Sequence, residues 1–222
     1  MSDTVITVRG TAREEHAAER AVVRVGVGHD GPRREAVVST AAATADRVRA
    51  GLEPLQAAGA VSTWSSDRVA IWSDRPWNAD GRRLPLVYHA SVAFVATFVA
   101  FDELARWVEE VGLLDGVDVG SIAWELTDET RDAALERVRT RAVQDAKAGA
   151  LVYARAAGLQ SVRAVAIADP GLLSGPEPGM PVPGAAPMAR AFAAKEASGP
   201  ALAFTPADLE VAAEVEARFS AS

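Results

Sequence analysis

Asp145 and Lys147 are the residues that come nearest to a catalytic pair, because a carboxylate beside an ammonium group can exchange protons with a substrate. They occur in the stretch AVQDAKAGALVYARAAGL, whose alanines and glycine follow a helical rhythm. Arg141 precedes Asp145 by four residues, the spacing at which opposite charges pair on a helix surface. We therefore interpret Asp145 and Lys147 as solvated residues on the flank of a packed helix.

The stretch GVGHDG, Gly26 to Gly31, fits the G-x-G-x-x-G pattern of dinucleotide-binding turns. It follows a strand-like segment and precedes a helical one, but Pro32 delays that helix. Gly26 and Gly28 also have the alternation of a strand, and Glu53, at the distance of the expected acidic partner, falls inside a predicted helix. The favoured interpretation is strand and turn glycines. The alternative function is a nucleotide- or small-ligand-binding protein, or an enzyme, that uses the turn from Gly26 to Gly31.

No residue pattern indicates a metal ion or a covalent nucleophile. The chain has no cysteine, which excludes thiolate chemistry and cysteine metal sites. Its histidines, at positions 16, 29 and 89, form no helical pair, and neither G-x-S-x-G nor S-x-x-K occurs. We expect no catalytic residue, no cofactor and no metal, and hence a protein that is not an enzyme.

The remaining candidates are aromatic and basic residues around one predicted turn. Trp64 and Trp72 lie eight positions apart in one predicted strand, so we expect them to share a face. Tryptophan and arginine are enriched at the energetic centres of protein interfaces, and ordinary core and edge packing is the other explanation. The predicted interface consists of Trp64, Trp72, Trp77, Arg75, Arg82 and Arg83.

Charge and hydropathy exclude two classes of partner. With 23 basic and 30 acidic residues the net charge is −7, which argues against binding of nucleic acid, because phosphates attract a basic surface. No apolar run reaches the length that spans a membrane, so we expect no membrane insertion. The N-terminus lacks the charged and apolar regions of an export signal, and we expect a cytoplasmic protein.

Hydrophobic periodicity predicts the order β-β-α-β-β-α-β-α-β-loop-β, an α+β fold with helices layered on a mostly antiparallel sheet. The first strand is expected to end at Gly10. Residues 86–100 and 209–219 alternate clearly and predict half-buried strands. A Pro/Gly-rich loop covers residues 170–206. Residues 129–157 predict a long helix whose packed stripe consists of Leu135, Val138, Ala142, Ala146, Gly149, Tyr153 and Ala156.

Four stretches in order resemble the SIMPL domain family, also called domain of unknown function 541. They are VITVRGTA, LVYHASVAFVATFVAFDELARWVEEV, VDVGSIAWELTDETRDAALERVRTRAVQDAKAGALVYARAAGL and TPADLEVAAEVEARF. The resemblance covers nearly the whole chain and implies a single SIMPL-like domain over residues 1–222. The family has no catalytic motif, takes its name from an animal signalling adaptor, and has bacterial members that are often exported to the envelope. The resemblance therefore implies protein association.

From these observations we expect a non-enzymatic, self-associating protein that forms a homo-oligomer. Free strand edges or the tryptophan-rich surface would make the contacts. A second possibility is that an unknown protein partner reads the Pro-rich loop between Pro170 and Pro200.

Overall fold

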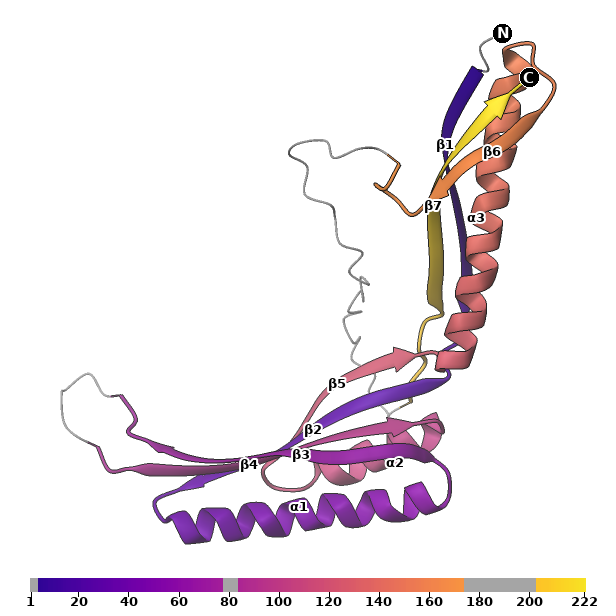
Figure 1. Ribbon diagram of the computed structural model, residues 1–222. Coiled ribbons are helices and arrows are strands. Elements are labelled where there is room, and N and C mark those ends of the chain that lie inside the picture. Colours follow the sequence, from indigo (N-terminus) through magenta and orange to yellow (C-terminus); the bar gives the residue numbers. More distant parts are fainter. Residues whose placement is uncertain (1–3, 78–83, 174–202) are drawn as a thin grey trace. The chain divides into compact units, whose positions relative to one another are not determined.

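The computed structural model describes residues 4–77, 84–173 and 203–222 (Figure 1). The order of the elements and their antiparallel pairing confirm the predicted α+β fold class. The strands are β1 (Thr4–His16), β2 (Arg20–Gly31), β3 (Val61–Asp74), β4 (Val87–Phe98), β5 (Val117–Glu125), β6 (Val162–Ala168) and β7 (Leu209–Ala221). The helices are α1 (Arg34–Ala57), α2 (Phe101–Gly112) and α3 (Asp128–Ala156).

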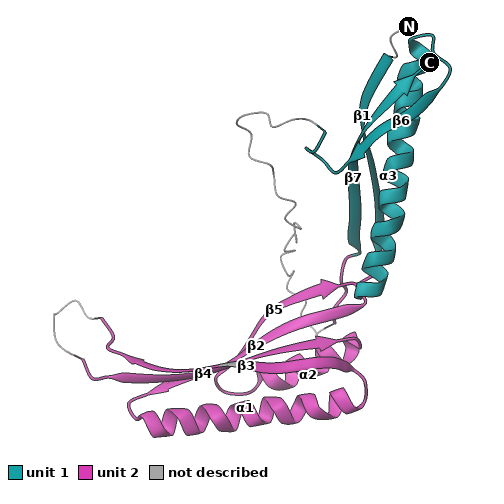
Figure 2. Ribbon diagram, in the orientation of Figure 1, with its two compact units in different colours: residues 1–16, 127–198, 208–222 teal, residues 17–126, 199–207 magenta. Residues whose placement is uncertain are grey.

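The chain divides into two compact units, which Figure 2 colours separately. Unit 1 holds residues 1–16, 127–198 and 208–222, and unit 2 holds residues 17–126 and 199–207. Each unit has its own sheet and its own hydrophobic core. The expectation of a single domain over residues 1–222 stays a prediction. Most of the Pro-rich loop, residues 174–202, lies outside the described residues.

Unit 2 is an antiparallel sheet of strand order β3-β4-β2-β5 with α1 and α2 packed on one face. Its strands alternate as the sequence predicts: Val23, Val25 and Val27 of β2 are buried while Arg24 and Gly28 are exposed. An antiparallel strand with one solvated face has this pattern. Within the described residues of unit 2, no helix covers the opposite face of the sheet, which is called the open face below.

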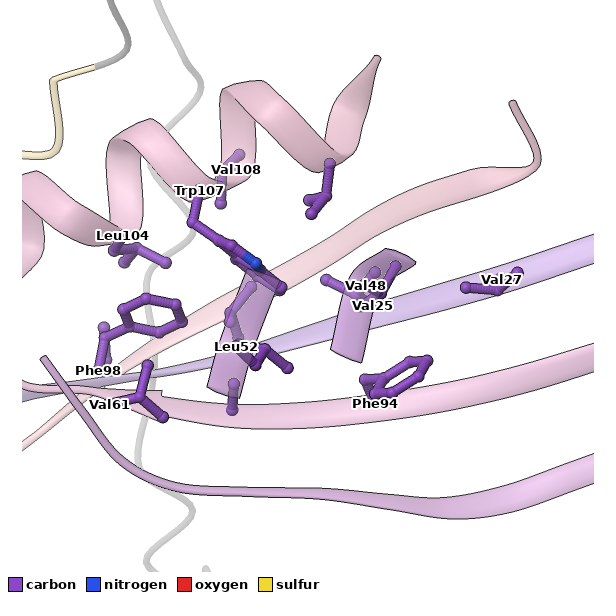
Figure 3. Packing of buried hydrophobic residues seen from close by; sticks show 14 of the residues in the cluster. Val25, Val27, Val48, Leu52, Val61, Phe94, Phe98, Leu104, Trp107 and Val108 are labelled. Atoms are coloured by element: carbon purple, nitrogen blue, oxygen red, sulfur yellow. The ribbon is translucent and has the colours of Figure 1, made fainter. Parts of the chain in front are cut away.

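Trp107 of α2 joins the two helices to the sheet (Figure 3). Its ring lies 5.3 Å from that of Phe98 in β4, centroid to centroid, and it is almost fully buried. A Cβ built on Gly51 of α1 would lie 3.0 Å from Trp107 Nε1. A glycine at this position of α1 thus leaves room for the indole, and the core of unit 2 closes around it.

Unit 1 is a sheet of order β1-β7-β6 covered on one face by α3. Thr127 caps α3, its hydroxyl accepting a hydrogen bond from the Thr130 N–H. The buried stripe of α3 differs from the predicted one: Gly149 is half-buried and Tyr153 is 62% exposed. The buried residues repeat at every fourth position and are Ala134, Val138, Ala142, Ala146, Ala150 and Ala154.

The physical reason for this correction is the direction of packing. A stripe that mixes spacings of three and four runs straight along a helix, whereas a row of pure fourth positions is inclined to the axis by about 26°. The buried stripe of α3 follows this inclined row, so Tyr153 falls outside it.

The predicted end of the first strand at Gly10 is also wrong, because β1 continues through Gly10 and α3 packs directly on its backbone.

Candidate functional site

Trp64 and Trp72 of β3 lie on opposite faces of the unit 2 sheet, contrary to the prediction that they share one. Trp64 is paired with Ala96 of β4, whereas Trp72 is paired with His89, an odd number of residues away. The register of β3 shifts between Ser65 and Arg68. A β-bulge inserts an extra residue on one strand and so reverses the faces beyond it.

Trp64 is therefore a partly buried residue that packs against the core of unit 2. Its ring packs 6.4 Å from that of Phe94, centroid to centroid, and its Nε1–H donates to Gln56 Oε1 at 3.0 Å. It lies against the buried cluster beneath α1. This residue of the predicted interface is thus directed inward.

Trp72 lies on the open face, stacked on His89. The two rings are 5.0 Å apart and inclined by 12°, and the indole side chain is 46% exposed. His89 Nε2 also lies 3.3 Å from Asp74 Oδ1 on β3. The stack and this polar contact hold an exposed aromatic face in one orientation at the far end of the β3–β4 hairpin.

Two further apolar side chains lie beside Trp72, on the other face of β3. Val69 is 67% and Ile71 is 42% exposed, and they are paired with Val92 and Ala90 of β4. β3 is the outermost strand of its sheet, with β4 as its one hydrogen-bonded neighbour within the described residues. Sequence reasoning missed Val69 and Ile71, whose exposure depends on this edge position and on the bulge, and it missed the role of the half-buried His89 because the stack depends on the register of β3 against β4.

The other residues of the predicted interface lie near the hairpin tip. Trp77 is 87% exposed. Arg75 Nη1 donates to the carbonyl oxygen of Leu84 across the hairpin, at 2.5 Å. Arg82 and Arg83 lie outside the described residues. The structure thus brings Trp72, Arg75 and Trp77 to one end of the hairpin and separates Trp64 from them.

The glycine stretch 26–31 is part of β2 throughout, not a turn between strand and helix. Gly26 is paired with Ala93 of β4 and with Asp118 of β5, and the Gly28 N–H donates to the Gly116 oxygen at 2.7 Å. Pyrophosphate binding in a dinucleotide fold needs free amides at a turn that opens a helix. Here the glycines lie within the hydrogen-bonded sheet. The turn geometry that nucleotide binding at Gly26 to Gly31 would need is therefore absent from this stretch.

Two shallow hollows occur in unit 2. One, of about 370 Å³, lies on the open sheet face between Arg24, Gly26, Ala93, Val95 and Asp118. The other, of about 240 Å³, lies at the start of α1 beside His29, Asp30 and Arg33. Both contain charges of each sign and open widely to solvent, so neither has the enclosed apolar lining of a typical small-molecule site. In the described part of the chain, no three acidic or histidine side chains gather as a metal site would.

Asp145 and Arg141 do not form the predicted pair along α3; both contact β1 instead. Asp145 Oδ2 accepts the backbone N–H of Thr11 at 3.0 Å. Arg141 donates to the Arg13 oxygen at 2.8 Å and to Glu14 Oε1 at 2.9 Å. Lys147 is exposed. Asp145 therefore has a structural contact with the free edge of the unit 1 sheet.

Two carboxylates of unit 1 have lowered pKa values. The pKa of Glu14 is below its ordinary value chiefly because Arg137 donates to it, at 3.0 Å from Nη2, with His16 and Arg141 adding to the effect. The pKa of Glu216 is lowered by the backbone N–H groups of Gly171 and Leu173 and by Arg9. Both carboxylates thus join separate segments of unit 1.

Fold and surface together define an α+β protein of two sheet-and-helix units, with an apolar strand edge and a stacked tryptophan at one hairpin. The sequence matches the SIMPL family, a protein family of unknown function (DUF541), over residues 6–219, and the chain belongs to that family. The match runs through both units. None of the curated proteins compared matches the chain. Within the described residues, no helix has the length and apolar character to cross a membrane.

Proposed function

We propose that this chain is a non-enzymatic association module that assembles with further copies of itself through the β3 edge. The β3 edge is defined here as Val69, Ile71 and Trp72 with the outward backbone of the same strand. An outermost strand that exposes apolar side chains is a template for pairing with another chain. The observation that supports the proposal is the exposure of all three side chains on a strand that, within the described residues, is paired on one side alone.

The outer edge of β1 differs, and the difference favours β3 as the contact. Side chains of α3 form hydrogen bonds with backbone groups of β1. Asp145 accepts from the Thr11 N–H, and Arg141 donates to the Arg13 carbonyl oxygen. Covering an edge in this way protects it from pairing. The β3 edge instead presents a rigid aromatic stack and two aliphatic side chains, the composition of an interface centre.

Light scattering after size exclusion, at two protein concentrations, tests the proposal. A discrete multiple of 23.2 kDa that persists on dilution is the expected result. Trp72→Ala should lower this mass, since it removes the exposed ring. Val152→Ala is the matched control, because Val152 is an exposed aliphatic residue of α3 in unit 1. A monomeric wild-type chain, or equal loss of mass in both variants, contradicts the proposal.

The cytoplasmic location expected from the sequence belongs to the same proposal. Fractionation of cells that produce the chain without added tags, followed by immunodetection, measures it directly. Recovery in an extracytoplasmic fraction would contradict the location and leave self-association to be judged by the mass.

A further inference from the structure

The side chains of α3 cover one half of the β1 edge and not the other. On one side of this helix, Arg137, Arg141 and Asp145 follow one another at every fourth position. All three contact β1, between Thr11 and Glu14. The buried residues of α3 form a parallel row with the same spacing, so this neighbouring row stays on the β1 side along the helix.

The next two positions of the same row leave space beside β1. One is Gly149, where a Cβ would meet nothing within 4 Å. The other is Tyr153, whose side chain is 62% exposed. The row that supplies charged side chains to one half of the edge therefore supplies a glycine and an accessible aromatic ring to the other half.

The backbone of β1 is available along this second half. The Thr11 N–H points away from β7, and alternate residues of an antiparallel strand direct their backbone groups to the same side. The pairing of β1 with β7 has no register shift, so Val5, Thr7 and Arg9 also direct N–H and C=O away from β7. Within the described residues, the hydrogen bonds from α3 to the β1 backbone end at Thr11. Residues 4–9 are called the free end of β1 below.

We infer that the free end of β1 receives the β3 edge of a second copy, with Trp72 entering the space beside Gly149. This inference rests on the proposed function and specifies the surface that the β3 edge contacts. Beyond its register shift, β3 runs regularly from Val69 to Asp74, a segment as long as the free end of β1. A strand added to an exposed edge gains affinity from main-chain hydrogen bonds and specificity from alternate side chains. The contact is heterologous, because each copy uses a different surface, and the two sheets become one joined sheet.

The orientation of the Trp72 ring fits this contact. One face of the indole is stacked on His89 of β4, 5.0 Å away between centroids, so the other face is turned away from β4. Because β3 is the outermost strand, that face is directed beyond the edge of its sheet. In the joined sheet it would lie over Gly149, which leaves room for the ring, and beside Tyr153, with which it could form an aromatic pair.

The other exposed apolar side chains meet on the opposite face of the joined sheet. Val69 and Ile71 lie on the other face of β3 from Trp72, so they would point away from α3 of the receiving copy. On β1, Ile6 packs beneath α3, and Val5 therefore lies on the face away from that helix, where it is 62% exposed. The contact would cover Val5 together with both aliphatic residues of the β3 edge.

This orientation also leaves room for α3. Trp72 lies on the open face of the unit 2 sheet, which no helix covers within the described residues. The helix α3 of the receiving copy would therefore lie on a side that is free of helices. With Ile71 turned toward α3 instead, α3 would lie on the side where α1 already packs against β3.

Light scattering of two aspartate variants in α3 tests the receiving surface. Gly149→Asp should reduce the mass of the assembly to that of one chain, 23.2 kDa, because the carboxylate occupies the space and can accept from β1 as Asp145 does at Thr11. Ala148→Asp is the matched control: it adds the same charge at an exposed position two residues from the buried Ala146, and it should leave the mass unchanged. Circular dichroism should show both variants folded, since neither position is packed against a neighbour.

Cross-linking of two single-cysteine chains tests the pairing itself, because the natural chain has no cysteine. A mixture of Thr7→Cys and Ser73→Cys chains should give a mixed product with a short bismaleimide, since both positions are exposed on the face of the joined sheet away from α3. Glu15→Cys replaces Thr7→Cys in the control. It is exposed on the same face of β1 but about 27 Å away at about 3.4 Å per residue, so it should give no mixed product.

The outcomes separate this inference from the proposed function. A mixed product together with loss of mass in Gly149→Asp supports both. An assembly whose mass is unchanged in Gly149→Asp, or in which Ser73→Cys chains become linked to one another and not to Thr7→Cys chains, overturns the contact with β1 and keeps self-association. A natural chain that is monomeric at both concentrations overturns both.

Discussion

Gly10 of β1 and Ala142 of α3 approach so closely that a Cβ on residue 10 would lie 2.0 Å from the Ala142 carbonyl oxygen. The same Cβ would lie 2.5 Å from the backbone nitrogen of Ala146. Both obstacles are main-chain atoms of a long helix, which cannot rotate away as a side chain can. The close packing of α3 on the sheet of unit 1 therefore requires a glycine at position 10. On the helix side, the buried alanines of α3 are the small residues that allow the same approach.

Gly10→Ala should destabilise unit 1 by about 3 kcal/mol or more, since the helix must move away from the sheet to admit one methyl group. Urea unfolding followed by circular dichroism measures this loss. Gly149→Ala is the matched control within α3, because its Cβ would meet nothing within 4 Å. It should stabilise the helix by about 1 kcal/mol. Similar unfolding midpoints for Gly10→Ala and the wild type would show that the close approach is absent.

Asp145→Ala should lower the free energy of unfolding by about 1 kcal/mol, because it removes the acceptor of the Thr11 N–H. Asp145→Asn keeps an acceptor oxygen and should recover part of the loss. Lys147→Ala, an exposed change two residues away, should lie within about 0.5 kcal/mol of the wild type. Equal effects of Asp145→Ala and Lys147→Ala would indicate that the contact with β1 contributes nothing.

Local pattern was enough to predict most elements of this fold. The alternation in residues 86–100 gives β4, a half-buried strand as predicted, whose buried face runs from Ala90 to Phe98. The spacing of Ala41, Ala45, Val48 and Leu52 gives the buried side of α1. These features depend on neighbours within a few positions, which a single sequence displays directly.

The position of the candidate site could not be predicted in the same way. The face of Trp72 depends on one extra residue between Ser65 and Arg68, and no residue type in that stretch requires a bulge. The pairing of β1 with β7 joins the two ends of the chain, so the role of Gly10 depends on contacts far apart in sequence. Packing between segments that are far apart in the sequence decides which residues come into contact. Asp145 therefore accepts from Thr11 of β1 and does not pair with Arg141 of its own helix.

The stability of unit 1 should fall in acid through Glu14. Its folded pKa lies below the ordinary value of 4.5, so the unfolded chain binds the proton more readily. The stabilisation is present above that ordinary value and is lost as the pH falls through the lower folded pKa. Glu14→Gln should therefore be less stable than the wild type near neutral pH, and the difference should shrink below about pH 4.5.

Urea midpoints for both proteins across this pH range measure the difference. Glu15→Gln is the control, because Glu15 follows in the same strand and is exposed. A difference between Glu14→Gln and the wild type that stays constant with pH would contradict a role for the charged carboxylate between Arg137 and Arg141.

Trp64 and Trp72 should give opposite results although they share one strand. Trp64→Ala removes a partly buried ring beside Phe94 and should cost about 2–3 kcal/mol, somewhat less than for a fully buried tryptophan. It should leave the mass of the assembly unchanged under conditions in which the variant remains folded. Trp72→Ala should do the reverse, lowering the mass while the unfolding midpoint of the separated monomer changes little. Measured together by unfolding and light scattering, the pair distinguishes a bulged β3 from a regular one, because in a regular strand both rings would lie on one face and respond alike.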